Sequence, residues 1–215
     1  MTLSKKNRVR IEPLELEDVY KMRHWEKHKS PLFEDYNFPE MTDEEAKGWY
    51  NFKAKKRSKK CFGIKNRKNI LIGYLTIRNI KKLTKKSTLG IVIDPKYINQ
   101  GYGTESLEVF LEYYFQNLNM KKLILQVAKF NERAIRCYDK CGFIIKDELY
   151  HVMENQKIDL NKELTNTEIN NNFKIKWNKI YIGYYEMYIT KELFYERTNK
   201  YIKTVNNSVD MWKSI

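Results

Sequence analysis

The sequence predicts one mixed α/β domain built on a single sheet, and three observations lead to this fold class. The chain has 215 residues, a length typical of one domain. Apolar residues make up 42% of it, which is enough to bury one core. Strand-like and helix-like apolar spacings interleave along the chain, as they do in α/β folds. We therefore expect a domain over residues 8–190 and a tail over residues 191–215.

The first part of the chain is expected to hold one strand and two helices. Residues 10–14 form a short strand that ends near a proline, and residues 15–28 show helical spacing of apolar side chains. Residues 30–40 contain two prolines and are interpreted as a loop. A second helix is predicted over residues 42–56, because a threonine there precedes a glutamate by three positions, as in a capping box.

Three strands are expected next. Residues 61–65 and 70–78 are two strand-like segments separated by a short polar stretch, which is typical of a hairpin. A basic turn over residues 79–86 leads to a third strand over residues 88–93. This strand is mostly apolar, which indicates burial, and Asp94-Pro95 ends it.

Helices and strands then alternate. A helix over residues 104–117 carries an apolar stripe, and residues 123–128 form the next strand. Residues 131–141 form a short helix with asparagine at its start and glycine just after its end, and another strand begins at residue 143.

The last third of the chain changes in composition. Residues 154–179 are rich in Asn, Lys and Glu, and we interpret them as a polar insertion or long loop. Three roles stay open for this segment: a lid, a contact in a homodimer, or disordered padding. Residues 180–189 return to a strand pattern, and the tail over residues 191–215 is expected to be helical.

Composition and charge argue against several classes of protein. No apolar run reaches the roughly 18 residues of a membrane-spanning helix, and the N-terminus lacks the apolar stretch of a secretory signal. The net charge is +14, but lysines are spread along the chain, which favours solvated faces over a nucleic-acid interface. Three cysteines do not form a disulfide framework, so reduced thiols in a cytoplasmic protein are expected.

Two of the cysteines, Cys137 and Cys141, lie four residues apart on one predicted helix. We interpret them as packing residues rather than as an acetyl-cysteine nucleophile, because no histidine lies near them in the sequence to activate a thiol. Two thiols without further ligands do not complete a metal site, so no metal is expected.

The strongest chemical signal is a glycine-bearing loop that opens onto a helix. It follows the strand that ends in Ile91, Val92 and Ile93, and it consists of Asn99, Gln100, Gly101, Tyr102, Gly103 and Thr104. Free backbone N–H groups at a helix N-terminus suit a diphosphate, and glycines permit positive φ and close approach of the ligand.

A second segment adds side chains that can do chemistry. In residues 131–143, Asn131 and Tyr138 lie on one face of the predicted helix, which places an amide and a phenol side by side.

Together the two segments resemble the Gcn5-related N-acetyltransferase (GNAT) family, and residues 10–78 fit its usual leading elements. The look is closest to the bacterial subgroup that acetylates ribosomal-protein N-termini, with polyamine and aminoglycoside acetyltransferases nearby. The resemblance implies a mostly antiparallel central sheet with flanking helices. It also implies transfer of acetyl from acetyl-CoA to a primary amine, with no metal.

The resemblance also assigns roles to residues. The backbone of Ile91, Val92 and Ile93 would bind the pantetheine, and the loop from Asn99 to Thr104 would hold the diphosphate. Asn131 would contact the cofactor arm, and Tyr138 would protonate the leaving thiolate as general acid.

The sequence departs from the family pattern at two positions. Ile98 stands where a Gln or Arg usually precedes the first glycine, and Gln100 could compensate in part. Thr88 stands where many relatives carry a glutamate that serves as general base. The base therefore stays open between Glu34, Asp35 and a chain of water molecules. A non-catalytic acetyl-CoA sensor or scaffold is the alternative function.

One local feature bears on the acceptor. Residues 31–46 hold six acids and no Lys or Arg. The resemblance implies that this loop, with Glu34, Asp35 and Tyr36, borders the acceptor pocket. Such a rim would attract a polyamine, an aminoglycoside or a basic protein N-terminus. The alternative is that the later acids of this segment only favour a helix N-terminus.

Overall fold

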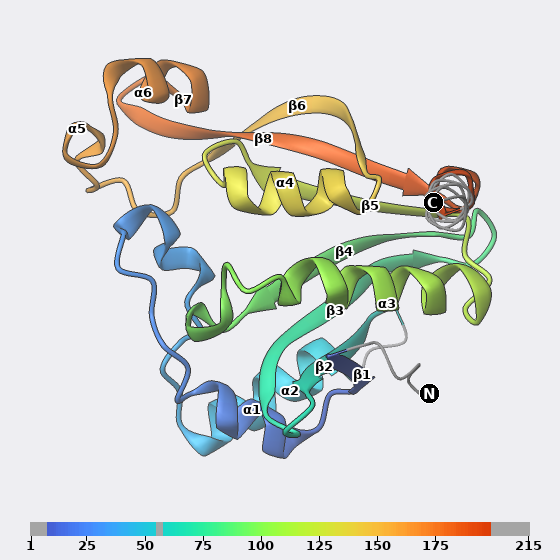
Figure 1. Ribbon diagram of the computed structural model, residues 1–215. Coiled ribbons are helices and arrows are strands. Elements are labelled where there is room, and N and C mark those ends of the chain that lie inside the picture. The colour runs from blue at the N-terminus through green and yellow to red at the C-terminus, as the bar shows by residue number, and fades with distance from the viewer. Residues whose placement is uncertain (1–7, 55–57, 199–215) are drawn as a thin grey trace, which may run out of the picture.

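The computed structural model describes residues 8–54 and 58–198, and its centre is one eight-stranded sheet (Figure 1). The strands follow the order β1-β2-β3-β4-β5-β8-β6, and β7 pairs with β8. Every pairing is antiparallel except that of β4 with β5. The strands are β1 (Val9–Pro13), β2 (Lys60–Asn66), β3 (Leu71–Lys81), β4 (Lys86–Ile93), β5 (Lys122–Ala128), β6 (Ile144–Val152), β7 (Phe173–Lys176) and β8 (Lys179–Thr190). The predicted mixed, mostly antiparallel sheet is confirmed.

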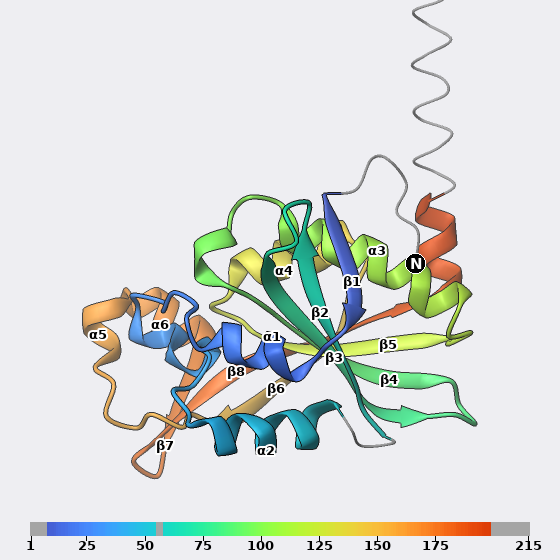
Figure 2. The same cartoon turned by 90° about the horizontal axis from the view of Figure 1, so that it is seen from below.

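Helices cover both faces of the sheet (Figure 2). One face carries α3 (Tyr102–Gln116) and α4 (Glu132–Lys140), and the other carries α1 (Leu16–Met22) and α2 (Asp43–Ala54). The apolar stripe of α3 is fully buried in the main core, as its spacing predicts, at Leu107, Phe110, Leu111 and Tyr114. Leu118, the last residue of the predicted stripe, follows the helix and is only partly buried. Such burial of large apolar side chains is the main force that fixes the helix there.

The two halves of the sheet meet over a short distance only. β4 and β5 pair in parallel from Lys86–Lys122 to Thr88–Ile124, and the pairing stops there. The hydroxyl of buried Tyr114 lies 2.8 Å from Ser87 Oγ on β4 and donates to the Lys122 carbonyl on β5, also at 2.8 Å. One side chain of α3 thus ties the two strands together at the point from which they diverge.

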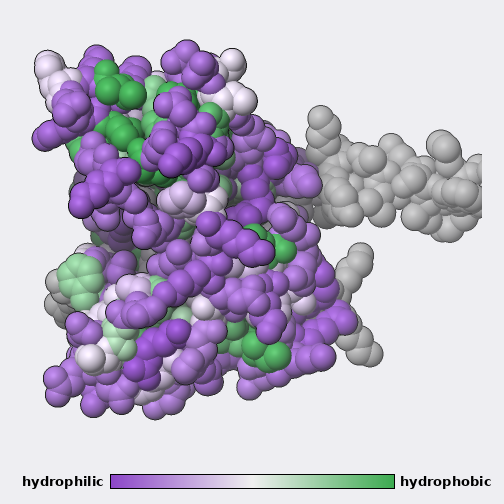
Figure 3. Space-filling view, turned by 90° about the vertical axis from the view of Figure 1, so that its left-hand side faces the viewer, coloured by the Kyte–Doolittle hydropathy of each residue, from purple (hydrophilic) through white to green (hydrophobic). Residues whose placement is uncertain are grey.

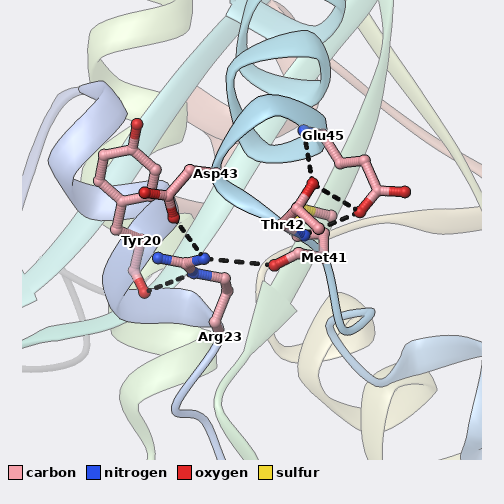
Figure 4. A network of polar contacts seen from close by, with 6 residues as sticks. All are labelled: Tyr20, Arg23, Met41, Thr42, Asp43 and Glu45. Carbon is pink, nitrogen blue, oxygen red and sulfur yellow. Dashed lines mark hydrogen bonds and ion pairs between the residues drawn. The ribbon is translucent and has the colours of Figure 1, made fainter.

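The corner between α1 and α2 is held by polar contacts (Figure 4). Arg23 donates to Asp43 Oδ1 at 2.7 Å and to the Met41 carbonyl at 3.2 Å. The predicted capping box is confirmed: the backbone N–H of Glu45 donates to Thr42 Oγ1, and the Glu45 carboxylate accepts from the backbone N–H of Thr42. These contacts tie the C-terminal end of α1 to the N-terminal end of α2.

Three interpretations from the sequence need correction. The first helix is shorter than residues 15–28, since α1 ends at Met22, and the expected loop over residues 30–40 contains the 3₁₀ helix η1 (Pro31–Tyr36). Residues 154–179 are not a long loop: they hold α5 (Leu160–Glu163), α6 (Asn166–Asn172) and strand β7. The buried apolar side chains Leu160 and Phe173 belong to the same hydrophobic cluster as Leu32 of η1.

The tail was predicted over residues 191–215, and the structure describes its first eight residues. Residues 191–198 are helical, and the rest of the predicted helix, residues 199–215, lies outside the described part of the chain. No helix in the part that the structure describes has both the length and the apolar character needed to span a bilayer.

Candidate active site

A cavity of about 380 Å³ opens where β4 and β5 diverge. Its walls come from residues 89–93 of β4, from the loop before α3, from α4, and from β3 and β5. Figure 3 looks onto the end of the molecule that faces left in Figure 1, where the surface is hollowed between its upper and lower parts.

Most of the predicted site residues meet in this cavity, although they come from four separate segments of the chain. Its lining contains Tyr36, Ile91, Val92, Ile93, Asn99, Gly101, Gly103, Thr104, Asn131 and Tyr138. Four others lie outside the lining, and these are Glu34, Asp35, Gln100 and Tyr102.

The edge of β4 fits an extended ligand. Ile91, Val92 and Ile93 pair with β3 on one side, but β5 has already diverged on the other. The backbone groups on the β5 side therefore have no strand partner at these residues, and they can bind an amide chain such as pantetheine.

The loop before α3 fits a diphosphate. Gly101 has a φ of +81° and Asn99 a φ of +60°, so the chain turns sharply and presents the N-terminus of α3 to the cavity. A Cβ on Gly103 would lie 3.5 Å from Cys137 Sγ, an ordinary van der Waals distance, so α3 and α4 are in close contact at this residue. The Gln100 amide donates to the Lys96 carbonyl at 2.9 Å, so this side chain braces the loop, and its expected compensation for Ile98 stays a prediction.

A basic residue that the motif analysis missed lies on the same loop. Arg8 forms an ion pair with Glu105 at 2.7 Å, donates to the Gln100 carbonyl at 3.1 Å, and stacks over the Tyr102 ring at 4.7 Å. Arg8 directly precedes β1, and only the fold brings it to α3, so no local pattern could have found it.

Tyr138 lies on α4 and is 8% exposed. Burial raises the pKa of its phenol, and the neighbouring Cys137 and Tyr36 act in the same direction, so the group stays protonated at neutral pH. Its ring packs edge-on against Phe143. A buried, protonated phenol in the cavity wall can donate a proton to a reacting group.

Asn131 supports the site from the N-terminus of α4. Its Oδ1 accepts from the backbone N–H of Ala134 at 3.2 Å, and only 4% of the residue is exposed. Burial raises the pKa of Tyr36, against the lowering effect of hydrogen bonds from the Asn131 side chain and the Ala128 backbone. Asn131 therefore positions α4 and Tyr36. Its contact with the cofactor, which the family resemblance implies, stays a prediction.

Three carboxylates form a rim next to Tyr36, and we call Glu34, Asp35 and Glu154 the acidic rim. Burial raises the pKa of Asp35, and repulsion by Glu154 and Glu34 raises it further. Asn155 donates to Glu34 Oε2 at 3.1 Å and so joins the inserted segment to η1. Glu154 was missed because it lies in the segment interpreted as a polar insertion or long loop, for which the sequence assigned no site residues.

The cavity lining itself is basic. It includes Lys53 at the end of α2, Arg78 on β3 and Arg133 on α4. Burial lowers the pKa of Lys53, and Lys59 and Arg78 contribute by repulsion. His28 also lines the cavity, although the sequence placed it far from the motifs. Within the described residues, no cluster of three or more His, Cys, Asp or Glu is arranged to hold a metal ion.

A diverging strand pair, a glycine loop at a helix N-terminus and a buried phenol together define an acyl-CoA N-acyltransferase. The family described as acetyltransferase (GNAT) domain matches residues 8–144. The chain belongs to this GNAT family and is an acetyl-CoA-dependent N-acetyltransferase.

Curated relatives point to one subgroup. The spermidine N(1)-acetyltransferase of Escherichia coli K12 is 30% identical over 148 residues, which covers 66% of this chain and 76% of the relative. The spermidine N(1)-acetyltransferase of Vibrio cholerae is 26% identical over 111 residues, covering 52% and 64%.

Solved structures share the fold. The spermidine N-acetyltransferase of Vibrio cholerae in complex with CoA and spermine has a TM-score of 0.66 at 21% identity, and the match covers 87% of this chain and 98% of that one.

Proposed function

We propose that the protein transfers acetyl from acetyl-CoA to a primary amine of a polyamine. The observation that carries this proposal is the acidic rim beside Tyr36, at one end of a cavity that fits the coenzyme. Three clustered carboxylates attract a flexible polycation and can pair with its remaining ammonium groups. The spermidine acetyltransferases among the relatives support the same acceptor class.

The reaction joins the amine nitrogen to the thioester carbonyl and releases a thiol. Backbone N–H groups of β4 are placed to stabilise negative charge on the carbonyl oxygen. The loop from Asn99 to Thr104 and the edge of β4 hold the coenzyme, which fixes the thioester relative to the acceptor. Tyr138 acts as general acid toward the leaving sulfur.

The charges around the cavity give the acceptor a direction. Lys53 and Arg78 lie at the α2 end and repel ammonium groups. Among the described residues on the side of Tyr36, the three carboxylates of the acidic rim outnumber the one guanidinium there, that of Arg133. A polyamine therefore binds with one amine at the thioester and its cationic tail toward η1 and Glu154. The competing acceptor is a basic protein N-terminus. In such a peptide the distance from the reacting amine to the next cationic group differs from that in a polyamine.

The test is a thiol-release assay with acetyl-CoA and a panel of amines, consisting of spermidine, spermine, an aminoglycoside and a basic peptide with a free N-terminus. We expect turnover with the two polyamines at lower KM than with the other acceptors. Preferred turnover of the peptide would reject the polyamine assignment, and no turnover with any amine despite coenzyme binding would reject the function.

A further inference from the structure

The amine must lose a proton before it can attack, and the cavity has few groups that can take it. Among the described residues of the lining there is no Asp or Glu. Thr88 stands where the resemblance implies a glutamate that acts as general base. Glu34 and Asp35 lie outside the lining. Glu34 and Asp35, the carboxylates considered as bases from the sequence, therefore lie next to the lining residue Tyr36 but do not line the cavity themselves.

His28 does line the cavity, in company with Tyr36 and Tyr138. It follows α1, and its backbone N–H donates to Asn37 Oδ1 at 2.7 Å, which fixes this stretch of chain against the end of η1. Its ring lies 5.3 Å from the Phe33 ring and 6.5 Å from the Tyr36 ring. Two aromatic side chains of η1 thus hold the half-buried imidazole.

The surroundings of the imidazole keep it uncharged. Burial lowers its pKa, and the guanidinium of Arg133, which reaches it from α4, lowers it further. Tyr36 is the titratable neighbour on η1, and its own raised pKa keeps it neutral. A neutral imidazole has a free lone pair at neutral pH and can accept a proton.

We propose that His28 is the proton acceptor for the amine, an assignment that rests on the acetyl transfer proposed above. The ammonium loses one proton to a ring nitrogen of His28, directly or through one water molecule. The neutral nitrogen then attacks the carbonyl carbon, the C–N bond forms and the C–S bond breaks. Tyr138 gives its proton to the sulfur and regains one from the amide nitrogen, and the imidazolium releases its proton to solvent.

The experiment compares His28→Gln with His24→Gln, a matched change at an exposed histidine on the same segment. We expect His28→Gln to lower kcat for spermidine about 10²-fold, within the usual range for a general base. The loss should shrink as pH rises, because the amine deprotonates in solution. Thermal stabilisation by CoA should stay unchanged in both variants, and His24→Gln should behave as wild type.

A second variant tests the role of His28 by shifting the pKa of its imidazole and leaving the residue in place. Arg133→Gln takes away the cation that faces His28, so the pKa of the imidazole rises. The acidic limb of the kcat profile, where His28 becomes protonated and inactive, should then move to higher pH.

The outcomes separate the two proposals. Suppose that the wild type turns over, that His28→Gln keeps kcat within about threefold, and that the acidic limb of Arg133→Gln does not shift. These results would overturn the role of His28 and leave the acetyl transfer standing. Absence of turnover by the wild type with every amine would overturn both.

Discussion

Arg8 and Glu105 are 97 positions apart in the sequence, yet the guanidinium Nε lies 2.7 Å from the Glu105 carboxylate in the first turn of α3. The same guanidinium binds the Gln100 carbonyl. The pair therefore fixes both sides of Gly101, the residue with left-handed backbone at the start of the helix. It also brings a cation to a loop that has Ile98 where the family resemblance implies a Gln or Arg.

We predict that Arg8→Gln weakens binding of CoA about tenfold, because the loop loses its brace and the diphosphate loses a nearby cation. S-acetylpantetheine lacks the diphosphate and should bind the variant as it binds wild type, as measured by calorimetry. Arg10→Gln is the control, since Arg10 pairs with Glu12 and Asn69 away from the loop. An equal loss for both ligands would mean a general disturbance of the fold.

Removal of the Tyr138 hydroxyl tests the general acid. Tyr138→Phe should lower kcat by about 10²-fold or more and leave the Kd of CoA nearly unchanged. Burial raises the pKa of the Tyr138 phenol above about 10, the ordinary pKa of a tyrosine. Ionisation of Tyr138 should therefore not lower the activity of the wild type at pH values up to and beyond about 10. Weak CoA binding with normal turnover in the variant would instead make Tyr138 a binding residue.

The acidic rim should act on the acceptor and not on the coenzyme. Asp35→Asn and Glu154→Gln are expected to raise the KM for spermidine about three- to tenfold each, and the effect should weaken at high salt. Glu44→Gln, on the exposed surface of α2, is the matched control. Initial rates at several ionic strengths measure this, and an unchanged KM in both rim variants contradicts the proposed orientation of the polyamine.

Cys137 offers a chemical probe of the coenzyme site. Hydrogen bonds from the Cys141 thiol and the Thr104 hydroxyl lower the pKa of Cys137, whereas burial raises that of Cys61 to about 12. A lower pKa means that the thiolate forms at lower pH, so iodoacetamide should label Cys137 first, and faster as pH rises. CoA should slow the labelling, since Cys137 lines the cavity.

The control for this labelling is Cys137→Ser, which should abolish the first modification seen by mass spectrometry. Modification of Cys61 before Cys137, or labelling that CoA leaves unchanged, would place the thiol outside the coenzyme site.

Features that depend only on residues close together in the sequence were predictable from the sequence. The apolar stripe of α3, the glycine loop and the Thr42–Glu45 capping box each depend on spacings of seven residues or fewer, and the structure has all three. The segment at 154–179 was misjudged because its polar composition hides a few widely spaced apolar residues, such as Leu160 and Phe173, that are buried.

Side chains that only the topology brings to the site could not be found in this way. Arg8 reaches α3 because β1 lies beside that helix, and His28 enters the cavity because η1 folds back over the start of α4. Glu154 joins Asp35 only because the chain after β6 returns to η1. Each of these contacts spans tens of residues, and no local periodicity encodes it.

Lys53 provides a test of acceptor direction that is independent of the acidic rim. Its half-buried ammonium lies 5.6 Å from the centre of the Trp49 ring, and it faces the repulsion of Arg78 across the same end of the cavity. Lys53→Gln removes one of the cations that exclude a polyamine from this end. Spermine, the longer acceptor, should then gain about three- to tenfold in kcat/KM relative to spermidine, because its extra ammonium can occupy either end.

Lys47→Gln, on the exposed part of α2, should leave this ratio unchanged. A fall of the spermine-to-spermidine ratio in Lys53→Gln would mean that Lys53 holds the acceptor in place instead of repelling it. That result would contradict the proposed direction of the polyamine, in which the ammonium of Lys53 repels the ammonium groups of the acceptor.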